Sequence, residues 1–156
     1  MIGAGEMLSL YYPIGVTGDV SSHVSDGTYA CPTERYLCEE FANFYADKLE
    51  SMGLGNWETT WDCDNFAWMY YTDIQWAHYA TKKSTAEGIS VGVCYYMAGA
   101  RAEDGSGGGH AINTAVVKED GEYKILFIEP QFAAVKKPCV LTLTPEEIAS
   151  IWLINF

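Results

Sequence analysis

A cysteine and a histidine have the residue types and positions that nucleophilic catalysis needs. A thiol becomes a useful nucleophile when its thiolate is stabilised, and the start of a helix supplies partial positive charge for this. Cys63 is the only cysteine of the chain expected at a helix start. Of His23, His78 and His110, only His110 opens an expected strand directly after a run of glycines. We therefore predict Cys63 as the nucleophile and His110 as its base.

The base of such a site needs a third group that orients its ring. Two apolar runs, at residues 110–118 and 123–129, are joined by an Asp-Gly turn, which indicates a β-hairpin. The turn aligns the strands so that Gln131 falls opposite His110, with Glu129 diagonal to it on the same face. We predict Glu129 as the orienting residue, with Gln131 as the second choice.

Other polar and aromatic side chains near Cys63 are candidates for supporting roles. An oxyanion hole needs donors, and the Cys63 backbone N–H together with the upstream amide of Asn56 is the predicted pair. Asn56 is equally well explained as a turn residue. Trp57 and Trp61 flank the nucleophile in a loop and are predicted to line a substrate cleft or a sugar-stacking surface.

Two carboxylates, Asp62 and Asp64, flank Cys63 and offer the hard oxygen ligands that Ca²⁺ prefers. Acidic residues at a helix start also complement the helix dipole, and we favour this explanation. No cofactor is expected to be required. No firm metal ligand is predicted.

The elements that position these residues follow from hydrophobic periodicity and from Gly and Pro signals. We expect an irregular arm or strand near the start, then helices at 32–53 and 63–81. Strands are expected at 88–98, 110–118, 123–129 and 140–143, of which 110–118 and 123–129 form the hairpin. A flexible glycine-rich loop is expected at 102–109, and a short capped helix opens at 144–147. Helices followed by an antiparallel sheet predict an α+β class, in one domain spanning residues 1–156.

Composition limits the function classes. The formal charge of the 156-residue chain is −12, which argues against nucleic acid and anionic membranes as partners. No apolar run approaches the roughly 20 residues that span a bilayer. The first residues lack a basic n-region, so a signal peptide is not expected. We therefore expect a soluble protein with a cytoplasmic location. Oligomeric state is not predicted.

Three short motifs in order resemble a known family. Asp62-Cys63-Asp64-Asn65-Phe66-Ala67 resembles the cysteine motif of bacterial and phage members of the papain-like and transglutaminase-like superfamily. Gly109-His110-Ala111 resembles its histidine motif, and Glu129-Pro130-Gln131 stands where its third residue belongs. The short intervals and the glutamate are most similar to the peptidase domain of the fungal Marasmius agglutinin. The resemblance implies a papain-like fold, a cysteine protease or hydrolase with a catalytic triad, and calcium or manganese dependence.

Two classes of function follow and stay open. The first is a cysteine hydrolase that cleaves an amide bond in a peptide, protein or peptidoglycan; acyl transfer of the transglutaminase type would use the same residues. The second is a catalytically silent binding module that recognises carbohydrate or protein through its aromatic side chains.

Overall fold

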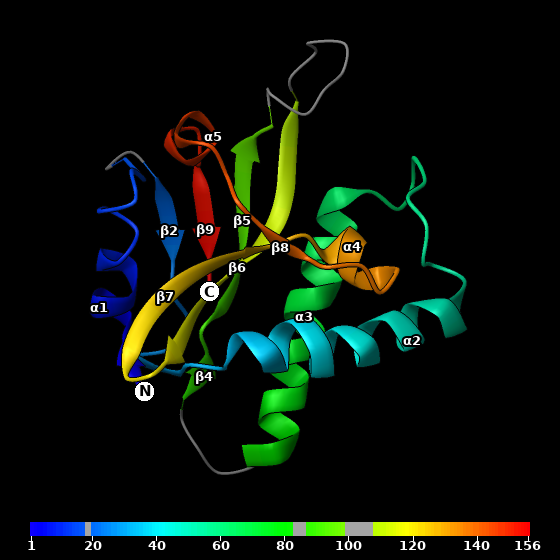
Figure 1. Ribbon diagram of the computed structural model, residues 1–156, viewed down its shortest axis with the longest axis horizontal. Helices are drawn as coiled ribbons and strands as arrows, with labels where there is room; N and C mark the ends of the chain where they lie inside the picture. The colour runs from blue at the N-terminus through cyan, green and yellow to red at the C-terminus, as the bar shows by residue number, and fades with distance from the viewer. Residues whose placement is uncertain (18–19, 83–86, 99–107) are drawn as a thin grey trace.

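A mixed six-stranded β-sheet forms the centre of the molecule (Figure 1). The computed structural model describes residues 1–17, 20–82, 87–98 and 108–156, so residues 102–107 of the expected glycine-rich loop lie outside the described part. The strand order is β2-β9-β5-β6-β7-β8. Their bounds are Ser21–His23 (β2), Leu153–Asn155 (β9), Val91–Met97 (β5), Gly109–Glu119 (β6), Glu122–Ile128 (β7) and Val140–Leu141 (β8).

A second, three-stranded sheet has the order β1-β3-β4. It consists of Ile2–Gly3 (β1), Thr28–Ala30 (β3) and Gly88–Ile89 (β4). Both sheets contain one parallel pair, β2 with β9 and β3 with β4, and their other pairs are antiparallel. The early strands therefore join strands that come much later in the chain.

The helices lie on both sides of the six-stranded sheet (Figure 1). Their bounds are Ala4–Ser9 (α1), Tyr36–Phe41 (the π-helical η1), Ala42–Met52 (α2), Cys63–Lys82 (α3), Pro130–Ala134 (α4) and Pro145–Ala149 (α5). None of these described helices is long and apolar enough to cross a membrane. One core cluster packs α2 and α3 against inward-facing residues of β6 and β7, among them Ala115 and Leu126. Another packs α1 and the chain end against the opposite face.

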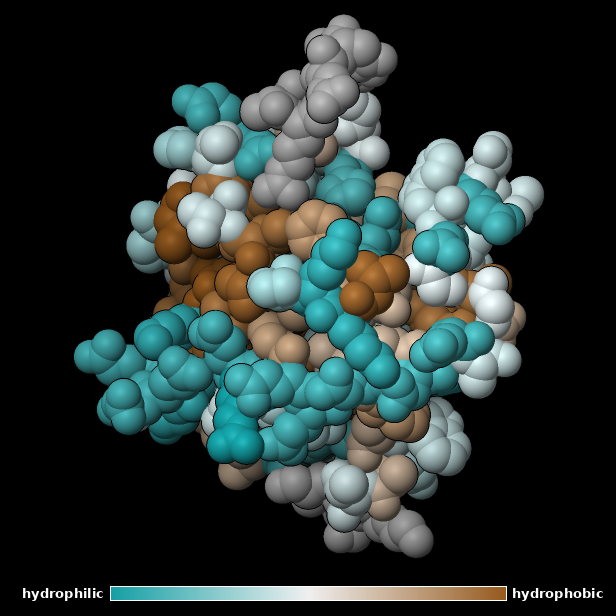
Figure 2. Space-filling view, turned by 45° about the vertical axis from the view of Figure 1, so that its right-hand side comes forward, coloured by the Kyte–Doolittle hydropathy of each residue, from teal (hydrophilic) through white to brown (hydrophobic). Residues whose placement is uncertain are grey.

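Polar and apolar groups share the surface. Figure 2 shows brown apolar residues gathered in the middle of one face and teal hydrophilic side chains along its lower edge. Several large aromatic side chains are exposed, including Trp76 at 71% and Trp57 at 58%. Scattered apolar surface of this kind is normal for a globular chain.

The predicted fold class, helices followed by an antiparallel sheet in a papain-like arrangement, is wrong. The sheet is mixed, and three short strands precede α2, so the fold is a mixed α/β arrangement. The strands at 21–23 and 28–30 lie in a Gly, Ser and Asp-rich segment that reads as a loop. Their pairing partners are distant in sequence, so local periodicity does not reveal them.

Several individual elements are confirmed. The hairpin has the predicted register, with Glu119 opposite Glu122. Pairing ends at Asn113 with Ile128, because Pro130 starts α4, so it does not extend as far as Gln131 and His110. The expected strand at 140–143 is shorter than predicted, and the expected arm at 7–16 is partly helical.

Candidate functional site

Cys63 is the first residue of α3, and the chain before it is held in place. Glu58 and Trp61 form a two-residue β-bridge in the preceding loop. The Asp62 N–H donates to the side-chain oxygen of Asn65 at 3.2 Å. The half-buried thiol sits at the positive end of a 20-residue helix.

Asn113 ties the cysteine helix to the histidine strand. Its side-chain nitrogen donates to the Ala67 carbonyl of α3 at 3.0 Å and to the Gly92 carbonyl of β5 at 3.1 Å. Asn113 is fully buried and lies three residues after His110 on β6. The bond fixes α3 against the sheet and so limits how far Cys63 moves relative to His110.

His110 and Glu129 form the closest polar contact of the site. The His110 Nε2 atom lies 2.7 Å from Oε2 of Glu129, whose side chain is only 5% exposed. The imidazole also meets the Tyr96 ring edge-on, with centroids 5.7 Å apart. The Cys63 thiol is a hydrogen-bond partner of the same imidazole. Because Glu129 occupies Nε2, the Nδ1 atom is left to exchange a proton with the thiol.

The electrostatics favour a charged imidazole. Burial, the largest influence, lowers the His110 pKa, but hydrogen bonds and charges from Cys63 and Glu129 outweigh it. The net result raises the pKa of His110 to about 9. A protonated ring beside the sulfur stabilises a thiolate, which is the reactive form of a cysteine.

Glu129 is itself held from several directions. It is the N-cap of α4, and its Oε1 atom accepts from the Gln131 backbone N–H at 3.2 Å. Its own backbone N–H donates to the Cys139 carbonyl at 2.8 Å. Glu129 is therefore the residue that contacts the histidine. Gln131 contributes its backbone N–H, which helps to position the Glu129 carboxylate.

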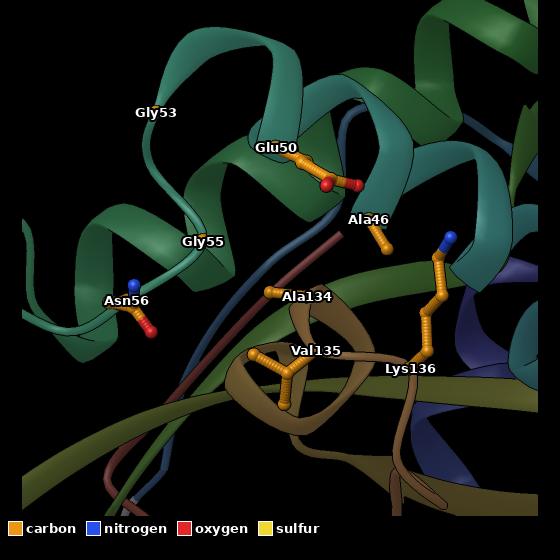
Figure 3. A pocket seen from close by; sticks show the side chains of 8 residues that line it. All are labelled: Ala46, Glu50, Gly53, Gly55, Asn56, Ala134, Val135 and Lys136. Carbon is orange, nitrogen blue, oxygen red and sulfur yellow. The ribbon is translucent and has the colours of Figure 1, made fainter.

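Asn56 lies elsewhere than predicted. It is exposed and lines a pocket of about 360 Å³ with the segment after α2 and with Ala134, Val135 and Lys136 at the end of α4. Figure 3 shows the Asn56 side chain with Ala134 and Val135 across the pocket from it. Its amide takes part in none of the described hydrogen bonds, so its oxyanion role stays a prediction.

The two predicted substrate-lining tryptophans differ. Trp57 is 58% exposed, in keeping with a contact surface. Trp61 meets Phe66 edge-on at 5.5 Å and packs on the main core cluster. A substrate role therefore fits Trp57 better than Trp61.

The two predicted metal-binding carboxylates, Asp62 and Asp64, lie close enough to interact. This interaction raises the pKa of Asp64 above its ordinary value, with burial as a second cause. The described residues contain no cluster of three or more His, Cys, Asp or Glu side chains arranged to hold a metal. The pairing between Asp62 and Asp64 is therefore a local contact in the described part of the chain, and calcium dependence stays a prediction.

One residue that sequence reasoning did not select packs on the same small cluster as Cys63. Tyr95 of β5 packs with Cys63 on a small cluster formed by Ala67, Val93 and Ala111. The Trp68 indole N–H donates to the Tyr95 hydroxyl at 2.9 Å. The signal that could have found Tyr95 is the pairing of β5 with the histidine strand, in which Tyr95 is opposite Ala111.

Comparisons with known proteins give a fold likeness only. No protein-family model and no curated protein matches the chain. Several solved structures match the chain, among them the following two. One is described as a complex of PSL1a with E-64, with 19% identity, a TM-score of 0.65, and coverage of 99% of this chain and 50% of that one. The other is Polyporus squamosus lectin bound to a human-type influenza-binding epitope, with 19% identity, a TM-score of 0.60, and coverage of 96% and 48%. The chain thus spans about half the length of both.

These findings correct the family assignment. The resemblance to the papain-like and transglutaminase-like superfamily, and to an agglutinin peptidase domain within it, is not supported, since no such family matches and one neighbour is described as a lectin. The terms hydrolase, cysteine protease and catalytic triad, which the resemblance implied, are therefore also unsupported as family descriptions of this chain. The short motifs that suggested the family are common enough to arise outside it.

Proposed function

We propose that Cys63, His110 and Glu129 form a reactive-thiol site that attacks the carbonyl carbon of an amide. The observation that carries the proposal is the His110 ring, which contacts the Cys63 thiol and lies 2.7 Å from a buried carboxylate. A nucleophile, a base and an orienting group in this order are what such chemistry needs. The proposal rests on this geometry and not on any family.

The steps follow from the proton positions. The Cys63 thiolate adds to the carbonyl carbon while the imidazolium of His110 holds the proton. Collapse of the tetrahedral species breaks the C–N bond, and His110 gives its proton to the departing amine. The acyl thioester left on Cys63 is then released to water or to a second amine, with His110 accepting the proton of the attacking group.

The binding of E-64 by one structural neighbour supplies a probe. E-64 is an epoxide that alkylates nucleophilic thiols, and that neighbour is described in complex with it. We expect E-64 at near-neutral pH to add once to this chain, on Cys63, as seen by intact mass and peptide mapping. His110→Ala should slow the addition by roughly 100-fold, the scale of a lost general base.

Cys31 provides the matched control, because it is also half-buried but has no contact with His110 among the described residues. Cys31→Ser should leave the E-64 adduct unchanged. Slow labelling of Cys31 and Cys63 at equal rates would sink the proposal.

A second function, recognition of carbohydrate, is favoured by the description of the other neighbour as a glycan-bound lectin. Exposed aromatic side chains such as Trp57 and Trp152 supply surfaces on which sugars stack. The chain corresponds to about half of that lectin, so glycan binding by the whole lectin comes to this chain only as a proposal.

Calorimetric titration with the glycan epitope of that lectin structure tests this second function. Binding that persists in Cys63→Ala and is lost in Trp57→Ala or Trp152→Ala supports carbohydrate recognition at the aromatic surface. If no heat of binding is measured at millimolar glycan, the chain does not bind this epitope.

A further inference from the structure

The Tyr95 hydroxyl is held in one position by the Trp68 indole, and Tyr95 packs on the same small cluster as the nucleophile. Its ring packs with Cys63 on the Ala67, Val93 and Ala111 cluster. The Trp152 ring lies against Tyr95 with centroids 6.0 Å apart. Trp152 is in turn close to Gly109, where an added Cβ would come within 3.0 Å of the indole. Tyr95 therefore contacts both Trp68 and Trp152, near the beginning of β6, where His110 lies.

The direction of the Tyr95 proton follows from its partner. An indole N–H can only donate, so the 2.9 Å contact with Trp68 makes the Tyr95 oxygen an acceptor. The hydroxyl hydrogen must then point elsewhere, and the described residues offer it no acceptor. Burial raises the pKa of Tyr95 more than the Trp68 bond lowers it, so the hydroxyl keeps this hydrogen at neutral pH.

We propose that Tyr95 is the side-chain donor of the oxyanion hole, giving its hydrogen bond to the carbonyl oxygen of a substrate attacked by Cys63. This inference rests on the proposed function, since an oxyanion forms only if Cys63 attacks a carbonyl. A donor that is fixed before the reaction stabilises developing charge without reorganisation. Tyr95 replaces Asn56, whose side chain lines a pocket with α4.

Two reactions of the same thiol separate this role from the reactivity of Cys63. Acylation by p-nitrophenyl acetate passes through an oxyanion, whereas alkylation by iodoacetamide does not. We expect Tyr95→Phe to slow single-turnover acylation roughly 100-fold, the scale of a lost oxyanion donor. Alkylation of Cys63 should stay within about twofold of wild type, since that reaction develops no oxyanion for the hydroxyl to stabilise.

Tyr71→Phe is the matched control, because Tyr71 packs on the same cluster and also meets Trp68. It should leave both rates unchanged. Unchanged acylation in Tyr95→Phe, with selective alkylation of Cys63 intact, overturns the role of Tyr95 alone. Loss of selective alkylation in the wild-type chain would instead overturn the proposed function.

A second inference concerns different residues, Cys38 of η1 and Cys139 before β8. Both thiols are free, and they lie close enough for each to shift the pKa of the other. They line one cavity of about 450 Å³, in which Cys38 is half-buried and Cys139 is 1% exposed. The contact with Cys38 lowers the pKa of Cys139, and the contact with Cys139 raises that of Cys38.

This pair is connected to the reactive-thiol site. The Cys139 carbonyl accepts the backbone N–H of Glu129 at 2.8 Å, and Glu129 holds His110. A change in the Cys139 backbone is therefore transmitted directly to the carboxylate that orients the histidine.

We propose that Cys38 and Cys139 form a disulfide when the chain meets hydrogen peroxide. The Cys139 thiolate attacks one peroxide oxygen, the O–O bond breaks, and protonation of the departing hydroxide gives water and a sulfenic acid. The Cys38 sulfur then displaces hydroxide from the sulfenic sulfur, and a second water forms. The two thiols are oxidised by two electrons and the peroxide is reduced.

Non-reducing peptide mapping after peroxide treatment of the Cys63→Ala chain tests the pair without interference from the reactive thiol. We expect one cross-linked peptide pair, 38 with 139, while buried Cys94 stays reduced. Cys38→Ser should abolish the cross-link and leave Cys139 trapped by dimedone as a sulfenic acid. A cross-link that is absent, or that joins Cys38 equally to other cysteines, overturns this inference.

Discussion

At the scale of single residues, Glu129 controls the charge of His110. The buried carboxylate and the thiol raise the His110 pKa to about 9 even though burial of the ring acts in the opposite direction. Glu129→Gln keeps the size and the helix-capping oxygen but removes the charge. We expect the His110 pKa, followed by NMR of its ring carbons, to fall toward the ordinary value of about 6.5.

His23 and His78 are internal controls for that titration, because neither is a partner of Glu129 in the described contacts. Their ring-carbon chemical shifts at a fixed pH should be the same in wild type and in Glu129→Gln. A His110 pKa that is equal in wild type and Glu129→Gln would show that the carboxylate does not act on the ring.

The same shift makes a prediction for stability. A pKa raised on folding stabilises the native state fully below the unfolded value near 6.5, and this stabilisation is lost as pH rises through about 9. We expect the free energy of unfolding of wild type to exceed that of Glu129→Gln by roughly 1–3 kcal/mol near pH 6.5. Urea titrations at pH 6.5 and 9.5 check this, and a difference that does not shrink with pH would contradict it.

At the scale of elements, Gly53 ends α2 in the left-handed conformation, with φ of 72°. A Cβ there meets nothing within 4 Å, so the cost of a side chain is purely conformational. We expect Gly53→Ala to lower the free energy of unfolding by about 1 kcal/mol. Gly55→Ala, also in open space but with no positive φ, is the control and should cost less; equal losses in urea unfolding would refute the explanation.

Elements whose cause is local could be predicted from the sequence. The helix stop at Gly53, the Asp-Gly turn and the capping box at Thr144 each depend on residues within four positions, and the structure contains all three. The strands β2, β3 and β9 depend on partners from distant parts of the chain. Local patterns do not specify such partners, which is why the sheet was predicted as antiparallel.

The same distinction applies to the candidate site. The register of the β6–β7 hairpin predicted from the sequence that His110 and Glu129 lie close together, because both residues belong to this hairpin or its ends. Tyr95 was missed because its place on the same cluster as Cys63 requires both the packing of α3 on the sheet and the pairing of β5 with β6.

At the scale of the whole molecule, the side chain of Phe156 packs in a core together with residues from the N-terminal part of the chain. Phe156 is 1% exposed and meets the Tyr11 and Tyr29 rings edge-on at 6.1 and 6.0 Å. We expect Phe156→Ala to lower the free energy of unfolding by about 3–5 kcal/mol in urea titrations. Phe132→Ala, at a side chain 43% exposed, should cost much less; similar losses would contradict the packing described here.

The central claim is that His110 activates Cys63, and the alkylation rate of Cys63 tests it most directly. The second-order rate constant with iodoacetamide is measured from pH 5 to 10 in wild type and in His110→Ala. We predict that wild type reacts at least about tenfold faster at pH 6–7, because the protonated ring stabilises the thiolate. Profiles that superimpose over the whole range would contradict the claim.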